Sequence, residues 1–285
     1  MIIQLEPYYE TKAWAASILS DIYGCGDDIG EAWVVSGFSN KSSIIKNGKY
    51  KGLHLSDVVK ELYNLDKFPI IIKLIANKEK LSVQVHPDDS YANKKHGKSG
   101  KLEVFYILDE NKSKEIILGT NAKDKNDLLD SIFKDSVEEK LIYKEINSND
   151  LIEIIPGTIH SILEDSFILE IQQSSDITYR LYDFNRIPRR SLHIEEAIAT
   201  VNIRSKGKFT NLEDTYSNKY FTINKYNING KFKRTYNDLI IYFILKGEGR
   251  INNYKIKKFD TFIINNEDIN IRGNLEIIEI SIEMR

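Results

Sequence analysis

Two short segments of the chain, residues 81–89 and 101–103, carry side chains that are able to bind a metal ion. On an extended strand, residues two apart share a face, so Ser82, Gln84 and His86 are expected on one face and the apolar residues between them on the other. The second segment repeats this alternation with a lysine and a glutamate, on what the pattern predicts to be the next strand. Histidine and glutamate that converge from neighbouring strands are ligands that divalent metals accept.

A further histidine follows a predicted turn in the segment 153–162, where a Pro-Gly pair ends one strand and His160 lies on the next. Together with Gln84, His86 and Glu103 it completes a ligand set that suits Zn²⁺, although other first-row divalent metals also accept such donors. A single histidine on such a strand is more often a hydrogen-bonded core residue, so the metal site depends on the segments coming together. The remaining histidines are expected to be solvated, capping or packing residues: His54, His96 and His193.

The segment 169–186 places Thr178 and Arg180 on one face of a predicted strand, which we expect to lie opposite the strand of Gln84. The guanidinium fork of Arg180 suits a phosphate dianion or a developing oxyanion, but an arginine on a solvated edge strand gives the same pattern. A neighbouring metal would lower the pKa of Lys101, so that its ammonium group could lose a proton and exchange it with a substrate. The alternative is that Lys101 is an ordinary solvated lysine.

Many short strands separated by turns predict a sandwich or barrel of the jelly-roll kind, with few helices. The segment after the first histidine strand, 88–100, is predicted to be a polar loop, and a smaller second β unit is expected near 218–285. That smaller unit contains no histidine and cannot repeat the site. Helices are predicted at 12–24, 56–63, 124–135, 137–143 and 192–201, and strand turns in the second unit at 229–230, 247–249, 252–253 and 272–273.

The bulk composition excludes several classes of protein. The 285 residues are 41% apolar and 29% charged, with a net charge of −2, so the chain is expected to be globular and not to bind nucleic acid. A single cysteine excludes an internal disulfide framework. The first residues do not form a signal peptide, and no apolar run approaches the roughly 18 residues of a membrane span. We therefore expect a cytoplasmic protein that has no membrane partner.

At the candidate metal-binding segments and the arginine segment, the sequence resembles the type I phosphomannose isomerases, in the short bacterial form that lacks the larger helical insertion. Departures from the family pattern are Ala15-Ala16 after Trp14, where the family has two glycines, and Phe105 in place of a common tryptophan. The motifs that carry the resemblance follow the family's order and spacing: 81–89, 100–103, 155–160 and 170–183, with smaller matches at 30–33 and 192–195.

The resemblance implies a mainly β, cupin-type fold of two jelly-roll units, with a few helices inserted at the N-terminus and between strands. Residues 1–205 would form the catalytic unit and residues 206–285 the smaller C-terminal unit. One Zn²⁺ per chain would be bound in the first unit. The implied zinc ligands are Gln84, His86, Glu103 and His160, with Gln84 either a direct ligand or a residue that orients the water on the metal.

The activity implied by the resemblance is the interconversion of D-mannose 6-phosphate and D-fructose 6-phosphate through a cis-enediol. Arg180 and Lys101 would be catalytic, and Ser82 and Asp183 would contact the sugar phosphate. Lys101 is the favoured general base, with Asp183 or a metal-bound water as alternatives. Other possible functions are an isomerase for another sugar phosphate, an iron dioxygenase, which a lysine and an arginine at the site disfavour, and a catalytically silent sugar-binding regulatory cupin. A monomer or a homodimer is expected.

Overall fold

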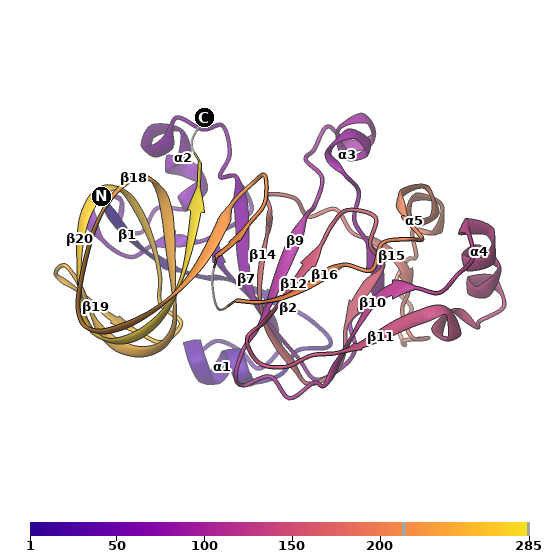
Figure 1. The fold of residues 1–285 in the computed structure, drawn as a ribbon. Helices are drawn as coiled ribbons and strands as arrows, with labels where there is room; N and C mark the ends of the chain where they lie inside the picture. Colours follow the sequence, from indigo (N-terminus) through magenta and orange to yellow (C-terminus); the bar gives the residue numbers. More distant parts are fainter. Residues whose placement is uncertain (213–214, 284–285) are drawn as a thin grey trace. The chain divides into compact units, whose positions relative to one another are not determined.

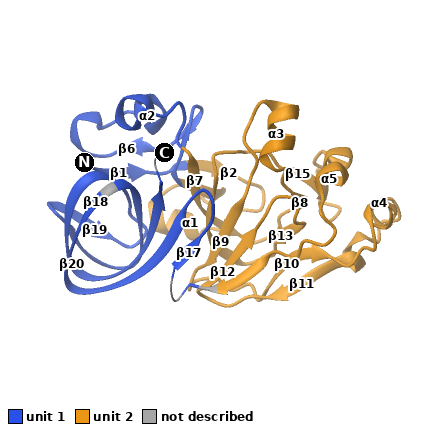
Figure 2. Cartoon of the chain, turned by 45° about the horizontal axis from the view of Figure 1, so that its top comes forward, with its two compact units in different colours: residues 1–8, 34–68, 211–285 blue, residues 9–33, 69–210 orange. Residues whose placement is uncertain are grey.

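The computed structural model describes residues 1–212 and 215–283 and is mainly β, as predicted (Figure 1). The chain forms two compact units, each built from segments that are far apart in the sequence (Figure 2). Unit 1 comprises residues 1–8, 34–68 and 211–285, and unit 2 comprises residues 9–33 and 69–210. The predicted domain boundary between residues 205 and 206 stays a prediction. None of the helices in the described part of the chain is long and apolar enough to cross a membrane.

Two sheets build unit 2. In the five-stranded sheet the order is β11 (Leu141–Glu145), β10 (Glu115–Thr120), β13 (His160–Ile162), β8 (Val83–Val85) and β15 (Tyr179–Tyr182). In the seven-stranded sheet the order is β16 (Lys208–Asn211), β12 (Asp150–Ile154), β9 (Glu103–Ile107), β14 (Ser166–Gln173), β7 (Ile70–Asn77), β3 (Ile29–Val35) and β2 (Tyr8–Thr11).

A core of apolar side chains from both sheets fills the interior of unit 2. It is made mainly of isoleucine, whose large apolar area favours burial. β7 and β14 are buried along their whole lengths, and the apolar, Ile-rich run over residues 68–76 that contains most of β7 is typical of a strand buried on both faces. The core includes Trp14, Ile75, Leu81, Phe105, Ile107, Ile116, Leu118, Ile152, Ile154, Ile162 and Ile168.

Short helices cover a second core of unit 2, into which Val83 and Val85 of β8 point. Leu81 departs from the predicted alternation, because it packs in the first core instead. Three helices contribute one buried residue each to this second core: Ala92, Leu128 and Ala197. The helices of unit 2 are α1 (Ile18–Tyr23), α3 (Asp89–His96), α4 (Lys125–Phe133), the 3₁₀ turn η2 (Val137–Lys140) and α5 (Ile194–Thr200).

Two predictions of secondary structure in unit 2 are wrong. The predicted loop at 88–100 contains α3, because Asp88 caps it by accepting a hydrogen bond from the Tyr91 N–H and Gly97 ends it in a left-handed conformation. These local caps outweigh the weak apolar pattern of the segment. The predicted helix at 137–143 is only the short turn η2, after which the chain enters β11.

Unit 1 contains a sheet dominated by two long antiparallel strands, β18 (Thr222–Ile251) and β20 (Thr261–Ile282). The predicted turns at 229–230, 247–249 and 272–273 are wrong, because β18 and β20 run through them, with positive φ at Gly230, Gly247 and Gly273. The turn at 252–253 is confirmed, since it joins β18 to β19. The other elements of unit 1 are β1 (Ile2–Glu6), β4 (Gly37–Phe38), β5 (Lys41–Ser42), β6 (Ile44–Ile45), η1 (Gly48–Tyr50), α2 (Leu55–Tyr63), β17 (Thr215–Ser217) and β19 (Tyr254–Lys257).

Candidate metal centre and pocket

Three neighbouring strands of the five-stranded sheet bring a histidine, a glutamine and an arginine into one row. β8 pairs antiparallel with β13 on one side and with β15 on the other. In this register Gln84 lies directly opposite His160 and also directly opposite Arg180. Directly paired residues project from the same face of a sheet, so the three side chains share one face. The arginine strand is therefore the neighbour of the Gln84 strand, and the prediction that it lies opposite is wrong.

Glu103 reaches the same place from the other sheet. It begins β9, which pairs with β12 and β14 in the seven-stranded sheet. β9 is the next strand along the chain after that of His86, as predicted, but the two strands are not neighbours in one sheet. The chain crosses between the sheets at residues 86–102, a segment that includes α3. The convergence that the sequence predicted is nevertheless present, because the two sheets face one another across the first core.

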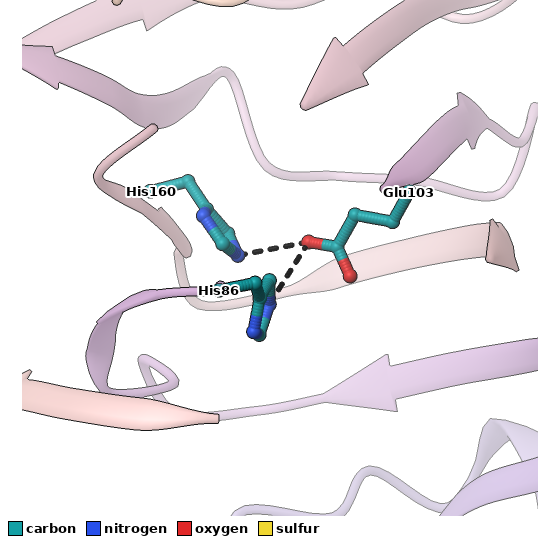
Figure 3. Close-up of side chains that lie close together, drawn as sticks. All are labelled: His86, Glu103 and His160. Carbon is teal, nitrogen blue, oxygen red and sulfur yellow. Dashed lines mark ion pairs between the residues drawn. The ribbon is translucent and has the colours of Figure 1, made fainter. Parts of the chain in front are cut away.

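His86, Glu103 and His160 form a buried cluster (Figure 3). Glu103 Oε1 lies 2.8 Å from His160 Nε2 and 3.4 Å from His86 Nε2. The two imidazole rings lie 4.9 Å apart between centroids, and all three side chains are almost completely buried. The cluster could hold a metal ion, since one ligand atom of each residue lies within 4.8 Å of the others.

The hydrogen bonds around the cluster fit a metal. His86 Nδ1 lies 2.9 Å from the Ile177 carbonyl oxygen, and His160 Nδ1 lies 3.0 Å from the Thr158 carbonyl oxygen. A carbonyl only accepts, so each Nδ1 carries a proton, and Nε2 is the nitrogen of each ring that faces the carboxylate and is placed to bind a metal. Neither oxygen of Glu103 has a hydrogen bond of good geometry among the described residues. Two lone pairs and a carboxylate that face one another are the donor set that a divalent cation satisfies.

Gln84 extends the set of possible ligands. Its side-chain amide lies 3.2 Å from His160 Nε2, beside the three clustered residues. The two ends of an amide are distinguished by their hydrogen bonds, and rotation by half a turn would direct the oxygen toward the cluster. The structure thus brings all four predicted ligands together. It also leaves both predicted roles of Gln84 open, the direct ligand and the orienting residue.

The protonation states of the cluster suit metal binding. Burial, and after it the Lys101 ammonium, lowers the pKa of His86 to about 3, so the imidazole is neutral near pH 7. Burial by itself would raise the pKa of Glu103, but Lys101 and the two imidazoles outweigh it and hold this pKa well below 4.5. A neutral imidazole at His86 and an ionised carboxylate at Glu103 are the forms of these two groups that bind metal.

Lys101 lies at the edge of the cluster, where two carboxylates favour its protonated form. Its Nζ lies 2.7 Å from Glu103 Oε2, 3.0 Å from Glu170 Oε1 and 3.3 Å from His86 Nε2. Burial by itself would lower the pKa of Lys101, but the two carboxylates raise it above its ordinary value. The two ion pairs outweigh desolvation in this respect, and the expectation that a bound metal lowers the pKa of Lys101 stays a prediction.

The ion pairs of Lys101 continue away from the cluster as a chain of alternating charges. Glu170 also pairs with Lys73 at 3.3 Å, Lys73 lies 3.9 Å from Glu31, and Glu31 pairs with Lys12 at 3.2 Å. The sequence analysis did not identify these four residues. Lys73 in β7 and Glu170 in β14 are each a single charged residue inside an otherwise apolar strand. This pattern could have indicated the ion pairs, because such a charge is rarely buried without a partner.

A pocket in unit 2, with a volume of about 160 Å³, opens beside the cluster. Gln84, Lys101 and Glu170 line it, as do Ser82 and Arg180 from the predicted site. It is therefore the place where the predicted catalytic and substrate residues meet the possible metal ligands. The remaining residues of its lining are Lys12, Trp14, Glu31, Lys73, Ile75, Leu81, Phe105, Ile162, Thr178 and Arg190.

Asp183, predicted to contact the substrate, is engaged elsewhere. As far as the described residues go, it does not line the pocket; both of its oxygens accept hydrogen bonds from Arg190. Arg190 was not singled out in the sequence, although it follows the arginine motif by only a few residues. Of the other histidines, His193 Nδ1 accepts a hydrogen bond from the Arg180 N–H, and His96 Nε2 lies 2.7 Å from the Tyr179 hydroxyl.

Comparison with known proteins identifies the family. Residues 2–145 match the model of the catalytic domain of type I phosphomannose isomerase. The chain is 34% identical to the mannose-6-phosphate isomerase of Streptococcus mutans, over 96% of each chain. It is 31% identical to mannose-6-phosphate isomerase ManA of Bacillus subtilis, over 91% of each.

A solved structure agrees with these relatives. The crystal structure of mannose 6-phosphate isomerase from Bacillus subtilis superposes with a TM-score of 0.88 at 31% identity, covering 98% of this chain and 99% of that one. The two jelly-roll units and the isomerase activity predicted from the motifs are thereby confirmed. The chain belongs to the type I phosphomannose isomerase family.

Proposed function

We propose that the chain interconverts D-mannose 6-phosphate and D-fructose 6-phosphate through a cis-enediol, with one zinc ion per chain at the candidate metal centre. The observation that carries this proposal is the convergence of His86, Glu103 and His160 beside a pocket that also presents Lys101 and Arg180. The relatives named mannose-6-phosphate isomerase support the choice of substrate.

His86, Glu103 and His160 would hold the zinc ion, and Gln84 would complete its protein ligands or orient what binds there. When bound, a zinc ion acts as a Lewis acid that polarises the carbonyl and hydroxyl oxygens of the sugar. The protein contributes burial: the three ligands are almost completely excluded from water, which strengthens electrostatic interactions with the reacting oxygens.

Lys101 and Arg180 would act on the sugar from two sides of the pocket. Lys101, held as a cation by Glu103 and Glu170, would donate its proton to the carbonyl oxygen of the sugar and then, as the neutral amine, take the proton from the neighbouring carbon as the predicted general base. The same two transfers in reverse, to the other carbon and from the other oxygen, would return Lys101 to its cationic form. Arg180 would stabilise negative charge as it develops on the enediol. Ser82 lines the same pocket and would donate a hydrogen bond to a sugar hydroxyl.

Asp183 would then serve the substrate indirectly, by holding Arg190 at the pocket. The expectations of a monomer or homodimer, of a cytoplasmic location and of no nucleic-acid or membrane partner stay predictions.

The test is a coupled assay with mannose 6-phosphate and, separately, glucose 6-phosphate as substrate. We expect the zinc-loaded protein to turn over mannose 6-phosphate preferentially and His86→Ala to abolish turnover. The matched control is His54→Ala, which removes a histidine at the start of α2 in the other unit. Preference for glucose 6-phosphate would assign another sugar phosphate, and binding without turnover of either would indicate a silent sugar-binding protein.

A further inference from the structure

The charges that line the pocket are unequally compensated. Three lysines of the lining, Lys12, Lys73 and Lys101, are balanced by three glutamates along the chain of ion pairs. Glu31 and Glu170 line the pocket as well, and Glu103 lies behind Lys101 in the cluster. The surplus of positive charge lies with Arg180 and Arg190, which line the same pocket. Among the described residues, Arg180 forms no ion pair, and the one carboxylate at Arg190 is shared with Arg186.

The loop after β15 returns to the strand and brings Arg190 to Arg180. A turn at its start is closed by the hydrogen bond from the Arg186 N–H to the Asp183 carbonyl oxygen. At its end, the Ser191 carbonyl oxygen accepts a hydrogen bond of 2.7 Å from Arg180 Nη1, and the His193 N–H donates to the Arg180 carbonyl oxygen at 2.7 Å. Arg190 directly precedes these two contacts, so it is fixed beside Arg180.

Asp183 fixes the orientation of Arg190. The Asp183 carboxylate accepts from Arg190 Nε at 2.7 Å and from Arg190 Nη2. A guanidinium group has five N–H donors, and this fork-to-fork pair uses only two of them. The donors that remain belong to a side chain that is 32% exposed and that lines the pocket.

The two guanidinium groups influence one another electrostatically. Burial, and next the charge of Arg190, lowers the pKa of Arg180. Two cations that repel one another at the wall of a pocket gain most from an anion bound between them. A sugar phosphate carries close to two negative charges near pH 7 and several strong acceptor oxygens.

We propose that Arg190, positioned by Asp183, is a specificity residue that binds the phosphate group of the substrate. Arg180 would lie between this phosphate and the candidate metal centre, so that its charge acts on both the phosphate and the enediol. This inference rests on the proposed function for its substrate class. It deepens that function by placing the phosphate at the arginine wall of the pocket. The sugar ring then extends from the phosphate toward the candidate metal centre, since Arg180 and Gln84 are direct neighbours across β15 and β8.

The test uses zinc-loaded protein and inorganic phosphate as the probe, with binding measured by calorimetry. Arg190→Ala should weaken phosphate binding by about 10- to 100-fold, the usual loss for a charge-assisted bidentate contact. Asp183→Asn should shift binding in the same direction, because Arg190 is then no longer held. Arg189→Ala is the matched control, since its side chain is exposed and adjacent in sequence, and it should bind phosphate like the wild type.

Kinetics with mannose 6-phosphate give the second readout. Arg190→Ala should raise KM by a similar factor with kcat changed by no more than about threefold, because a phosphate contact is present in both ground and transition states. Phosphate binding within twofold of wild type in Arg190→Ala, or no phosphate binding by the wild type, would overturn the inference. If the wild type binds phosphate through Arg190 but does not isomerise mannose 6-phosphate, the proposed function fails and the arginine assignment stands.

Discussion

Gln84 and Arg180 lie directly opposite one another on the neighbouring strands β8 and β15. On its other side, Gln84 is paired with His160. One residue of a short strand therefore connects a histidine of the candidate metal centre to the arginine of the pocket. The spacing between the possible metal and Arg180 is set by strand pairing, which is more rigid than a loop.

Replacing Gln84 tests its link to the metal. Gln84→Leu removes the amide beside His160 and keeps a similar volume, so we expect zinc affinity to fall by about 10- to 100-fold. Competition with a chromophoric chelator measures this affinity. Gln84→Glu, which keeps an oxygen donor, should retain most of it. If Gln84→Leu bound zinc as tightly as the wild type, Gln84 would be neither a ligand nor an orienting residue of the metal centre.

Replacing Arg180 tests the electrostatic role of its guanidinium group. We expect Arg180→Ala to lower kcat for mannose 6-phosphate by about 100- to 1000-fold, the range for loss of one donor to a developing oxyanion. Zinc content should not change, because Arg180 is not in the metal cluster. Steady-state kinetics with metal analysis on the same sample provide the measurement. Near-native kcat with a full complement of zinc would contradict the assignment.

Gly100 controls how closely the Lys101–Glu103 segment approaches the start of α3. A Cβ at this position would lie 2.8 Å from the Pro87 carbonyl oxygen and still closer to the backbone of Asp88. Since backbone atoms cannot turn away, Gly100→Ala must displace the segment. We expect a lower melting temperature and a lower zinc affinity together. Gly26→Ala is the control, because no positive φ is required there and a Cβ would meet only the side chain of Asp28, which can move. If Gly100→Ala keeps the melting temperature and the zinc affinity of the wild type, the close approach at Gly100 is not needed to position Lys101 and Glu103.

Glu31 makes stability depend on pH. Burial would raise its pKa, but Lys73, Lys12 and the Trp33 indole N–H lower it to about 2. Because the folded pKa lies below the ordinary value of 4.5, the stabilisation is complete above pH 4.5 and is lost as the pH falls toward 2. The shift corresponds to about 3 kcal/mol of unfolding free energy at most.

Urea unfolding of wild type and Glu31→Gln from pH 7 to pH 3 measures this contribution. The wild type should be more stable at neutral pH, and the difference should shrink on acidification. Glu6→Gln, which changes an exposed carboxylate, should show little difference at any pH. A difference between wild type and Glu31→Gln that stays constant with pH would contradict the linkage.

The sequence predicted the site better than it predicted the arrangement of strands around it. His86, Glu103 and His160 were identified because period-2 alternation assigns faces correctly within one strand. The strands of His86 and Glu103 were expected to be neighbours and are not, because alternation carries no information on which sheet a strand joins. α3 was missed because its stability comes from caps and tertiary contacts, whereas its own sequence is mostly polar.

The ion-pair partners of Lys101 could not be predicted from the sequence for a similar reason. Glu170 and Lys73 are neighbours only because β14 and β7 pair in a particular register, 97 positions apart in the chain. Without that pairing, Lys101 beside a metal was expected to lose charge, whereas two carboxylates hold its charge in the folded protein.

The account depends most on a catalytic metal held by His86, Glu103 and His160. Its most direct test is the rate of fructose 6-phosphate formation from mannose 6-phosphate by chelator-treated protein, followed as zinc is added in known ratios to the chain. We predict no activity before addition and full recovery at one zinc per chain. Activity that persists in the fully stripped protein, or that never returns with zinc while the fold is intact, would contradict the account.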